Sequence, residues 1–128
     1  MMDKNYKKKE AIEFGKFGEE ITAQYYIQDG YTILERNWRI GKTEIDLIAQ
    51  NEDVIVIIEV KARSGDDEDP LATITSDKRR RMIRAADSYI KRLKGQYQYR
   101  FDIATITGNM ENYQLEIFED AFVAADIF

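Results

Sequence analysis

The sequence feature that most constrains the fold is an uninterrupted aliphatic run, Val-Ile-Val-Ile-Ile, at residues 54–58. A strand with one face in water alternates apolar and polar side chains, and this run does not alternate. We therefore expect a strand that is covered on both faces, as in the centre of a mixed sheet. The run is also far shorter than the ~20 apolar residues that a membrane-spanning helix needs.

Two helices and four further strands are predicted around this strand. The helices are expected at residues 10–28 and 77–94, and the strands at residues 31–40, 44–50, 54–61, 99–107 and 113–118. The apolar positions of the helices recur at spacings of three and four: Phe14, Phe17, Ile21, Tyr25 and Gln28 in the first, and Met82, Ile83, Ala86, Tyr89, Ile90 and Leu93 in the second. The order α-β-β-β-α-β-β predicts an α/β fold with a central mixed sheet flanked by helices. A length of 128 residues suits one domain, residues 1–128.

Cysteine and histidine are both absent from the sequence. Without cysteine there is no disulfide, thiolate nucleophile or sulfur-ligated zinc site. Without histidine, Ser-His-Asp and Cys-His catalysis, HExxH zinc proteases and histidine-dependent nucleases are excluded. Acid-base chemistry must then come from Asp, Glu, Lys or Tyr. A bound metal must accept oxygen ligands, which indicates magnesium, manganese or calcium.

The charge is distributed unevenly along the chain. The net charge is −5, yet residues 78–100 contain nine basic residues and one acidic residue, whereas the C-terminal segment 102–128 contains six acidic residues and no basic one. Nucleic-acid binding depends on local potential, so the basic segment is compatible with a polyanionic partner. The alternative is a helix with a solvated basic face, balanced by an acidic tail. The acidic run at residues 66–69 has no interpretation from the sequence.

A hairpin between the second and third strands would bring two carboxylates together. If Glu52 and Asp53 form a two-residue loop, Asp46 lies directly opposite Glu59, with Cβ atoms ~5 Å apart. A three-residue loop would place the two carboxylates on opposite faces. Side chains alternate along a strand, so Lys61 shares the face of Glu59. By the same rule Glu44 and Asp46 share one face, and Ile45 and Leu47 the other.

The pattern Asp…Glu-x-Lys across a hairpin after a first helix resembles the PD-(D/E)xK nuclease superfamily. More closely, the chain resembles the small bacterial endonuclease-like proteins of the YraN type, over residues 15–102. The matching residues are Gly15-x-x-Gly18-Glu19, Ala23, Gly30-Tyr31-x-Ile33-Leu34, Arg36-Asn37-x-Arg39, Glu44-Ile45-Asp46-Leu47-Ile48-Ala49, Glu59-Val60-Lys61-Ala62-Arg63-Ser64, Pro70, Lys78 and Arg100-Phe101-Asp102. One departure is Thr43, where the family usually has glycine.

The resemblance implies a restriction-endonuclease-like fold, shared with archaeal Holliday-junction resolvases, and a role for each site residue. Asp46 and Glu59 would hold Mg²⁺ or Mn²⁺, helped by the carbonyl of Val60. Lys61 would orient the attacking water or stabilise charge on the phosphorane. Glu19 would reach the metal from the first helix. The chemistry is consistent, because a carboxylate-held magnesium beside a lysine supplies an activated water and stabilises a dianionic transition state.

The leading hypothesis is a cytoplasmic, magnesium-dependent endonuclease that acts on branched or structured DNA, with a homodimer suggested by the resolvase analogy. No membrane partner is expected. One alternative is a non-catalytic nucleic-acid-binding module on the same fold. Another is a protein-interaction scaffold in which acidic and basic segments pair between subunits.

Each candidate residue also has a purely structural interpretation. Glu59 and Lys61 could form an ion pair at a strand end, and Asp46 could be a turn or strand-end hydrogen-bonder. Glu19 could be a solvated helix charge. Glu44 could pair with Arg39 or Lys42. Lys78 lies on the inward side of its helix and is expected to point toward the site. It and further basic residues could grip phosphates or be solvated surface: Arg63, Arg79, Arg80, Arg81 and Arg84.

Overall fold

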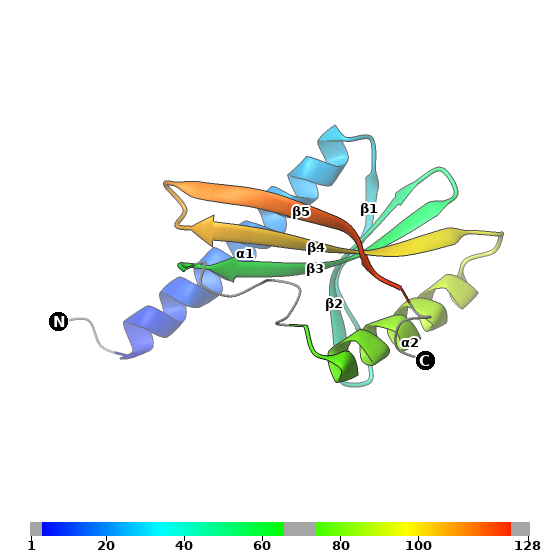
Figure 1. Ribbon diagram of the computed structural model, residues 1–128, viewed down its shortest axis with the longest axis horizontal. Coiled ribbons are helices and arrows are strands. Elements are labelled where there is room, and N and C mark those ends of the chain that lie inside the picture. Colours follow the sequence, from blue (N-terminus) through cyan, green and yellow to red (C-terminus); the bar gives the residue numbers. More distant parts are fainter. Residues whose placement is uncertain (1–3, 66–73, 124–128) are drawn as a thin grey trace.

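The computed structural model describes residues 4–65 and 74–123. Its elements are α1 (Lys4–Gln28), β1 (Thr32–Ile40), β2 (Thr43–Asn51), β3 (Val54–Arg63), α2 (Ser76–Arg92), β4 (Gln98–Gly108) and β5 (Tyr113–Phe122) (Figure 1). The predicted order α-β-β-β-α-β-β is confirmed. The acidic run at residues 66–69 and Pro70 lie outside the described residues. Within the described ranges, neither helix has the length and apolar character needed to cross a membrane.

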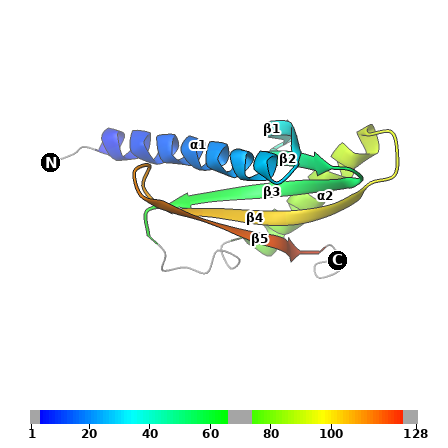
Figure 2. The same ribbon diagram turned by 90° about the horizontal axis from the view of Figure 1, so that it is seen from above.

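The strands form one mixed sheet in the order β1-β2-β3-β4-β5. β3 and β4 run parallel, with α2 between them in sequence, and the other neighbouring strands are antiparallel. β3 is central, and its aliphatic run from Ile55 to Ile58 is fully buried. Figure 2 shows the reason, since α1 lies on one face of the sheet and α2 on the other. The predicted α/β fold with a flanked mixed sheet is confirmed, in agreement with the restriction-endonuclease-like fold that the resemblance implies.

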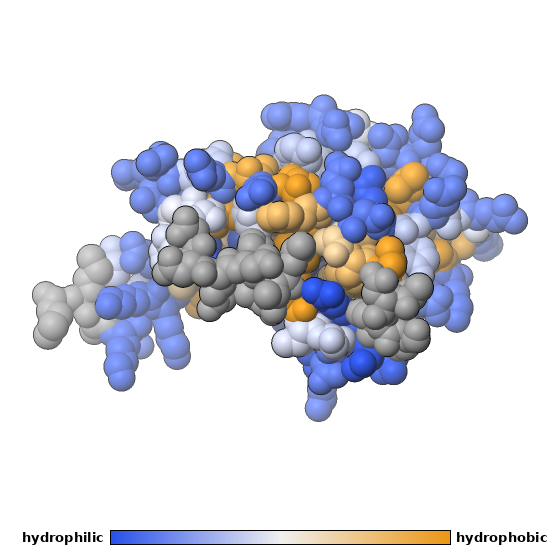
Figure 3. Space-filling view, in the orientation of Figure 1, coloured by the Kyte–Doolittle hydropathy of each residue, from blue (hydrophilic) through white to orange (hydrophobic). Residues whose placement is uncertain are grey.

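Each helix covers a separate hydrophobic core. The core under α1 contains Ala23, Tyr26, Leu47, Ala49, Val56, Ile58 and Ala104. The core under α2 contains, among others, Ile45, Ile48, Ile55, Ile57, Met82, Ala86, Tyr89 and Phe101. Residues of β3 thus alternate between the two cores, so Glu59, which follows Ile55 and Ile57 in this series, is directed toward α2. In the view of Figure 3, apolar side chains occupy the middle of the molecule and hydrophilic ones surround them.

The face that α1 buries differs from the predicted one. The buried residues are Gly18, Thr22, Ala23 and Tyr26, whereas Tyr25 of the predicted stripe is exposed. Close approach decides the outcome, because a Cβ on Gly18 would lie 3.2 Å from Ile106 Cδ1 and 3.3 Å from Ala62 Cβ. Small side chains let the helix backbone come near the sheet, and a stripe of aromatic residues would hold it away. The helix also begins six residues before the predicted start, and its first turns extend past the sheet (Figure 2).

The predicted hairpin register between β2 and β3 is confirmed as far as the two strands pair. The paired positions run from Asn51↔Val54 to Leu47↔Ile58, around a turn at Glu52 and Asp53. Glu52 adopts a left-handed φ of 54°. Beyond Leu47↔Ile58 the ladder stops, and the two strands diverge (Figure 1).

The fully buried carboxylate of Asp102 joins three elements. It accepts hydrogen bonds from the hydroxyl of Tyr26 in α1 (2.6 Å), from Nε and Nη2 of Arg100 in β4 (3.0 and 3.1 Å), and from the backbone N–H of Asp120 in β5 (3.0 Å). Burial and the neighbouring Asp102 carboxylate both raise the pKa of Tyr26. Asp102 therefore fixes α1 to β4, the strand that pairs in parallel with β3, which carries Glu59.

Candidate active site

The candidate site lies where β2 and β3 diverge. Asp46 is the first β2 residue past the last paired position, and Glu59 is the corresponding residue of β3. In place of a further ladder bond, Oδ2 of Asp46 accepts a hydrogen bond from the backbone N–H of Val60 at 2.8 Å. This bond holds the Asp46 carboxylate against the end of β3, next to Glu59.

Glu59 is buried, with 4% of its surface exposed, and two lysines approach the same carboxylate oxygen. Lys78 Nζ lies 2.6 Å from Glu59 Oε1, and Lys61 Nζ lies 3.9 Å from it. Lys78 comes from the first turn of α2, so the helix that covers this face also supplies a charge to the site. Burial and the neighbouring Lys78 ammonium lower the pKa of Lys61. The expectation that Lys78 points inward is met.

The carboxyl group of Asp46 has a strongly perturbed acidity. Burial and the nearby charge of Glu59 raise the pKa of Asp46 from 3.8 to about 7, against the opposing effect of the Val60 hydrogen bond. In a partly desolvated space the negative charge of Glu59 disfavours the charged form of Asp46, and a bound cation would relieve that repulsion. A strongly perturbed carboxyl group of this kind is typical of a functional site.

Glu19 reaches the same region from α1. Burial, together with the charges of Glu44 and Glu59, raises the pKa of Glu19. With the amide of Asn37 turned to donate, its nitrogen lies 3.2 Å from Glu19 Oε1 and 2.9 Å from Glu44 Oε1. Glu44 also forms an ion pair with Arg39 at 3.1 Å, which is the structural role predicted as its alternative. Asn37 thus holds Glu19 near Asp46 and Glu59, the candidate metal ligands.

Asn37 also marks an irregularity that the sequence did not reveal. It has a left-handed φ of 50°, and it lies between the pairs Arg36↔Leu47 and Trp38↔Ile45, opposite Asp46. Ile45 belongs to the core under α2 and Leu47 to the core under α1. The prediction that Ile45 and Leu47 share one face is therefore wrong, because strict alternation is interrupted at Asp46. Asparagine tolerates left-handed backbone better than most residues, and this is the one signal that sequence reasoning could have used.

The donor set suits a hard divalent cation. Asp46 and Glu59 offer carboxylate oxygens, and a strand residue directs its C=O to the same side as its N–H, so the Val60 carbonyl faces the end of β2. Magnesium commonly uses one or two carboxylates and keeps several waters. Among the residues that the structure describes, no group of three or more acidic side chains is already arranged to hold a metal ion. The carboxylate pair, with Glu19 nearby, therefore fits a water-rich magnesium site better than a closed cage.

Comparison with known proteins identifies the family of this chain. The profile of the Uncharacterised protein family UPF0102 matches residues 18–106. The chain belongs to this family. A UPF0102 protein of Phocaeicola vulgatus is 40% identical over 86% of the chain and 92% of its own length. One from Flavobacterium psychrophilum is 38% identical over 86% and 93%, and one from Clostridium perfringens is 38% identical over 90% and 98%. The predicted YraN-type resemblance is confirmed, since UPF0102 is that family.

The basic residues predicted to bind phosphate do not gather at the carboxylates of the candidate site. Arg79 stacks over the ring of Phe122 at 5.4 Å and donates to the carbonyl of Ile74 at 3.1 Å. Arg81 and Arg84 are exposed on α2. Arg80 forms an ion pair with Asp77 at 3.1 Å. Of the predicted phosphate-binding residues, Lys78 alone contacts one of the predicted metal ligands in the interactions described above.

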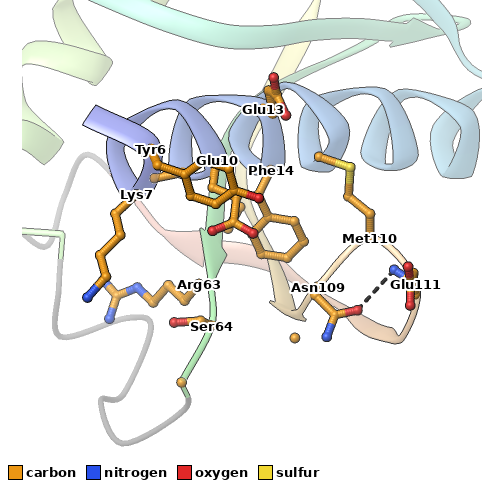
Figure 4. Close-up of a pocket in the computed structure, with 14 residues that line it drawn as sticks. Tyr6, Lys7, Glu10, Glu13, Phe14, Arg63, Ser64, Asn109, Met110 and Glu111 are labelled. Atoms are coloured by element: carbon orange, nitrogen blue, oxygen red, sulfur yellow. Dashed lines mark hydrogen bonds between the residues drawn. The ribbon is translucent and has the colours of Figure 1, made fainter. Parts of the chain in front are cut away.

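Arg63 follows Lys61 along β3 and lines a separate groove. This groove of about 1100 Å³ lies between the first half of α1 and the ends of β3 and β4, and Tyr6, Phe14, Arg63 and Met110 are among its lining residues (Figure 4). Neither Asp46 nor Glu59 lines it. The candidate site therefore lies where β2 and β3 diverge, outside this groove.

Proposed function

We propose that this UPF0102 chain is a magnesium-dependent endonuclease that hydrolyses phosphodiester bonds in branched or structured DNA. The observation that supports this most is the convergence of Asp46 and Glu59 past the last β2–β3 pair, with Lys61 beside them. Proteins rarely leave two carboxylates and an ammonium in a partly buried space unless they pair or bind something. With DNA as the substrate, we expect this activity in the cytoplasm.

Each residue has a definite task in this proposal. Asp46 and Glu59 would hold the cation, and the Val60 N–H fixes the orientation of Asp46. Bound magnesium would supply Lewis acidity and a water of lowered pKa. The ammonium of Lys61 would donate to a non-bridging phosphate oxygen, where negative charge accumulates in the transition state. Glu19, held by Asn37, would orient water at the site by accepting its hydrogen bonds.

DNA binding would use Lys78 at the site together with basic residues of α2 and β3 that lie beyond it. Lys78, Arg79, Arg81, Arg84 and Arg63 would contact phosphates, which gives affinity that is independent of sequence and weakens with salt. A two-fold symmetric junction requires two cuts, so we expect a homodimer on such a substrate.

A cleavage assay on labelled DNA tests the proposal. Duplex, single-stranded, flap and four-way-junction DNA, together with RNA, are incubated with Mg²⁺ or Mn²⁺ and the wild type, Lys61→Ala or Lys91→Ala. Lys91 is an exposed lysine of α2 that pairs with Asp87 at 2.9 Å, so its variant controls for loss of a positive charge. We expect cutting by the wild type and Lys91→Ala, and none by Lys61→Ala, with DNA binding nearly unchanged because Lys61 acts on the transition state. Equal cutting by all three proteins would refute the assigned role of Lys61.

One observation favours a second candidate, a nucleic-acid-binding module that does not cut. Lys78 and Lys61 already place two positive charges beside Glu59, so the site is charge-compensated by the chain itself. Salt-sensitive binding to one DNA shape, without cutting in either metal, would support this candidate over the nuclease.

A further inference from the structure

We propose that Lys78 is an internal counter-ion of the metal site, and that Lys78 and a divalent cation are alternative partners of Glu59. The cation would displace the Lys78 ammonium from Glu59, and the released ammonium would turn to a phosphate of the nucleic acid. Metal binding would thereby strengthen nucleic-acid binding. This inference rests on the metal site proposed above and adds a regulatory role for a residue of α2.

The contact between Lys78 and Glu59 is close and largely shielded from water. Nζ lies 2.6 Å from Oε1, and the Glu59 side chain is 6% exposed while that of Lys78 is 33% exposed. Charge-assisted hydrogen bonds of this length are among the strong ones. Among the residues that the structure describes, Lys78 is therefore the nearer of the two lysines that compensate this buried carboxylate.

An ammonium and a divalent cation cannot share this carboxylate without strong repulsion. Like charges a few ångströms apart repel far more in a partly buried site than in water. Lys61 is 3.9 Å away, whereas Lys78 lies at direct contact distance. Of the two lysines, Lys78 is the one that a cation on Glu59 must move.

The backbone of Lys78 is held in the first turn of α2, so only its side chain can move. Thr75 caps the helix and accepts a hydrogen bond from the Lys78 N–H at 3.2 Å. The Cα of Lys78 is thus fixed while its four-carbon side chain, partly exposed, can swing toward solvent. The same ammonium can then contact Glu59 in one state and a phosphate near the site in the other.

Metal binding in the absence of nucleic acid tests the inference without any activity measurement. Mn²⁺ is titrated by calorimetry into the wild type, Lys78→Met and Lys91→Met, the last being the matched lysine of the same helix. Removing the competing charge should tighten Mn²⁺ binding by roughly tenfold in Lys78→Met, with no change in Lys91→Met. Circular dichroism checks folding. If Lys78→Met does not fold, Lys78→Gln takes its place, because its amide keeps a donor for Glu59 and removes the charge.

The outcomes separate this inference from the function on which it rests. Absence of Mn²⁺ binding in the wild type and the variants alike would remove the metal site itself. Binding by the wild type, with equal or weaker binding by the Lys78 variant, would overturn the competition while the metal site stands. Fluorescence anisotropy of labelled junction DNA gives a second reading. Ca²⁺ should tighten binding to the wild type several-fold more than to Lys78→Gln, and an equal effect on both would refute the release of Lys78 to phosphate.

Discussion

Asp46→Asn should make the protein more stable at neutral pH while weakening its metal binding. The raised pKa of Asp46, about 7 against 3.8 in an ordinary environment, means that the folded state holds this proton more tightly than the unfolded chain does. Folding stability therefore falls as pH rises from about 4 to about 7 and stays low above that. An amide at position 46 carries no charge, and its oxygen can still accept the Val60 N–H.

The size of the effect follows from the two pKa values. A pKa that moves from 3.8 to about 7 corresponds to roughly 4 kcal/mol of lost stability when the group is ionised. Part of this cost remains in the variant, because burying an amide is also unfavourable. We expect Asp46→Asn to raise the free energy of unfolding by about 2 kcal/mol at pH 8. The gain should be small near pH 4, where Asp46 is protonated in the folded state and the unfolded carboxyl has only begun to lose its proton.

Urea unfolding between pH 4 and pH 8, with EDTA present, measures this difference. Asp87→Asn is the matched control, since Asp87 is an exposed carboxylate of α2 that pairs with Lys91. The control should not gain stability with rising pH relative to the wild type. Addition of Mg²⁺ should then stabilise the wild type and leave Asp46→Asn nearly unchanged. An Asp46→Asn protein that is no more stable than the wild type at pH 8 would refute the argument.

Three further predictions concern the buried Asp102 carboxylate and the turn at Gly108. Asp102→Ala should lower the free energy of unfolding by about 3–5 kcal/mol in urea titrations, because it leaves the Arg100 guanidinium partly buried without its carboxylate; a loss below 1 kcal/mol would contradict the role of Asp102. Tyr26→Phe, which removes one hydrogen bond to that carboxylate, should cost about 1–3 kcal/mol by the same method, less than Asp102→Ala. Gly108→Ala should cost about 1–3 kcal/mol in thermal melting, since Gly108 has a φ of 119° and a Cβ there would clash with the Asn112 carbonyl oxygen; an unchanged melting temperature would show that the turn relaxes.

The order of the elements along the chain and the approach of Asp46 to Glu59 were predictable from the sequence because both follow from local patterns. The aliphatic run identified the central strand, and a two-residue turn at Glu52 and Asp53 gave the register that places Asp46 opposite Glu59. The end of that register could not be predicted. Where β2 leaves β3 depends on the twist of the assembled sheet rather than on residues near Asp46.

The remaining features depend on contacts between residues far apart in the chain. The ion pair of Lys78 with Glu59 joins α2 to β3 across residues 66–73, and spacing alone gave only the direction of Lys78. The buried face of α1 was predicted from its aromatic residues, but close packing selected Gly18 and Ala23. The basic run of α2 indicated one phosphate-binding surface, whereas Arg79 packs on Phe122 and Arg80 pairs with Asp77. Those partners become apparent only in three dimensions.

The hydrogen bond from Val60 N–H to Asp46 has a consequence for spectroscopy. This amide is held by a side-chain carboxylate instead of a neighbouring strand, so its resonance frequency and its exchange with solvent should follow the protonation and the ligands of Asp46. A ¹⁵N-labelled sample therefore contains a single backbone nucleus that reports on the site without substrate, dye or substitution. Following this resonance while acid or a divalent cation is added would report directly on the state of the Asp46 carboxylate.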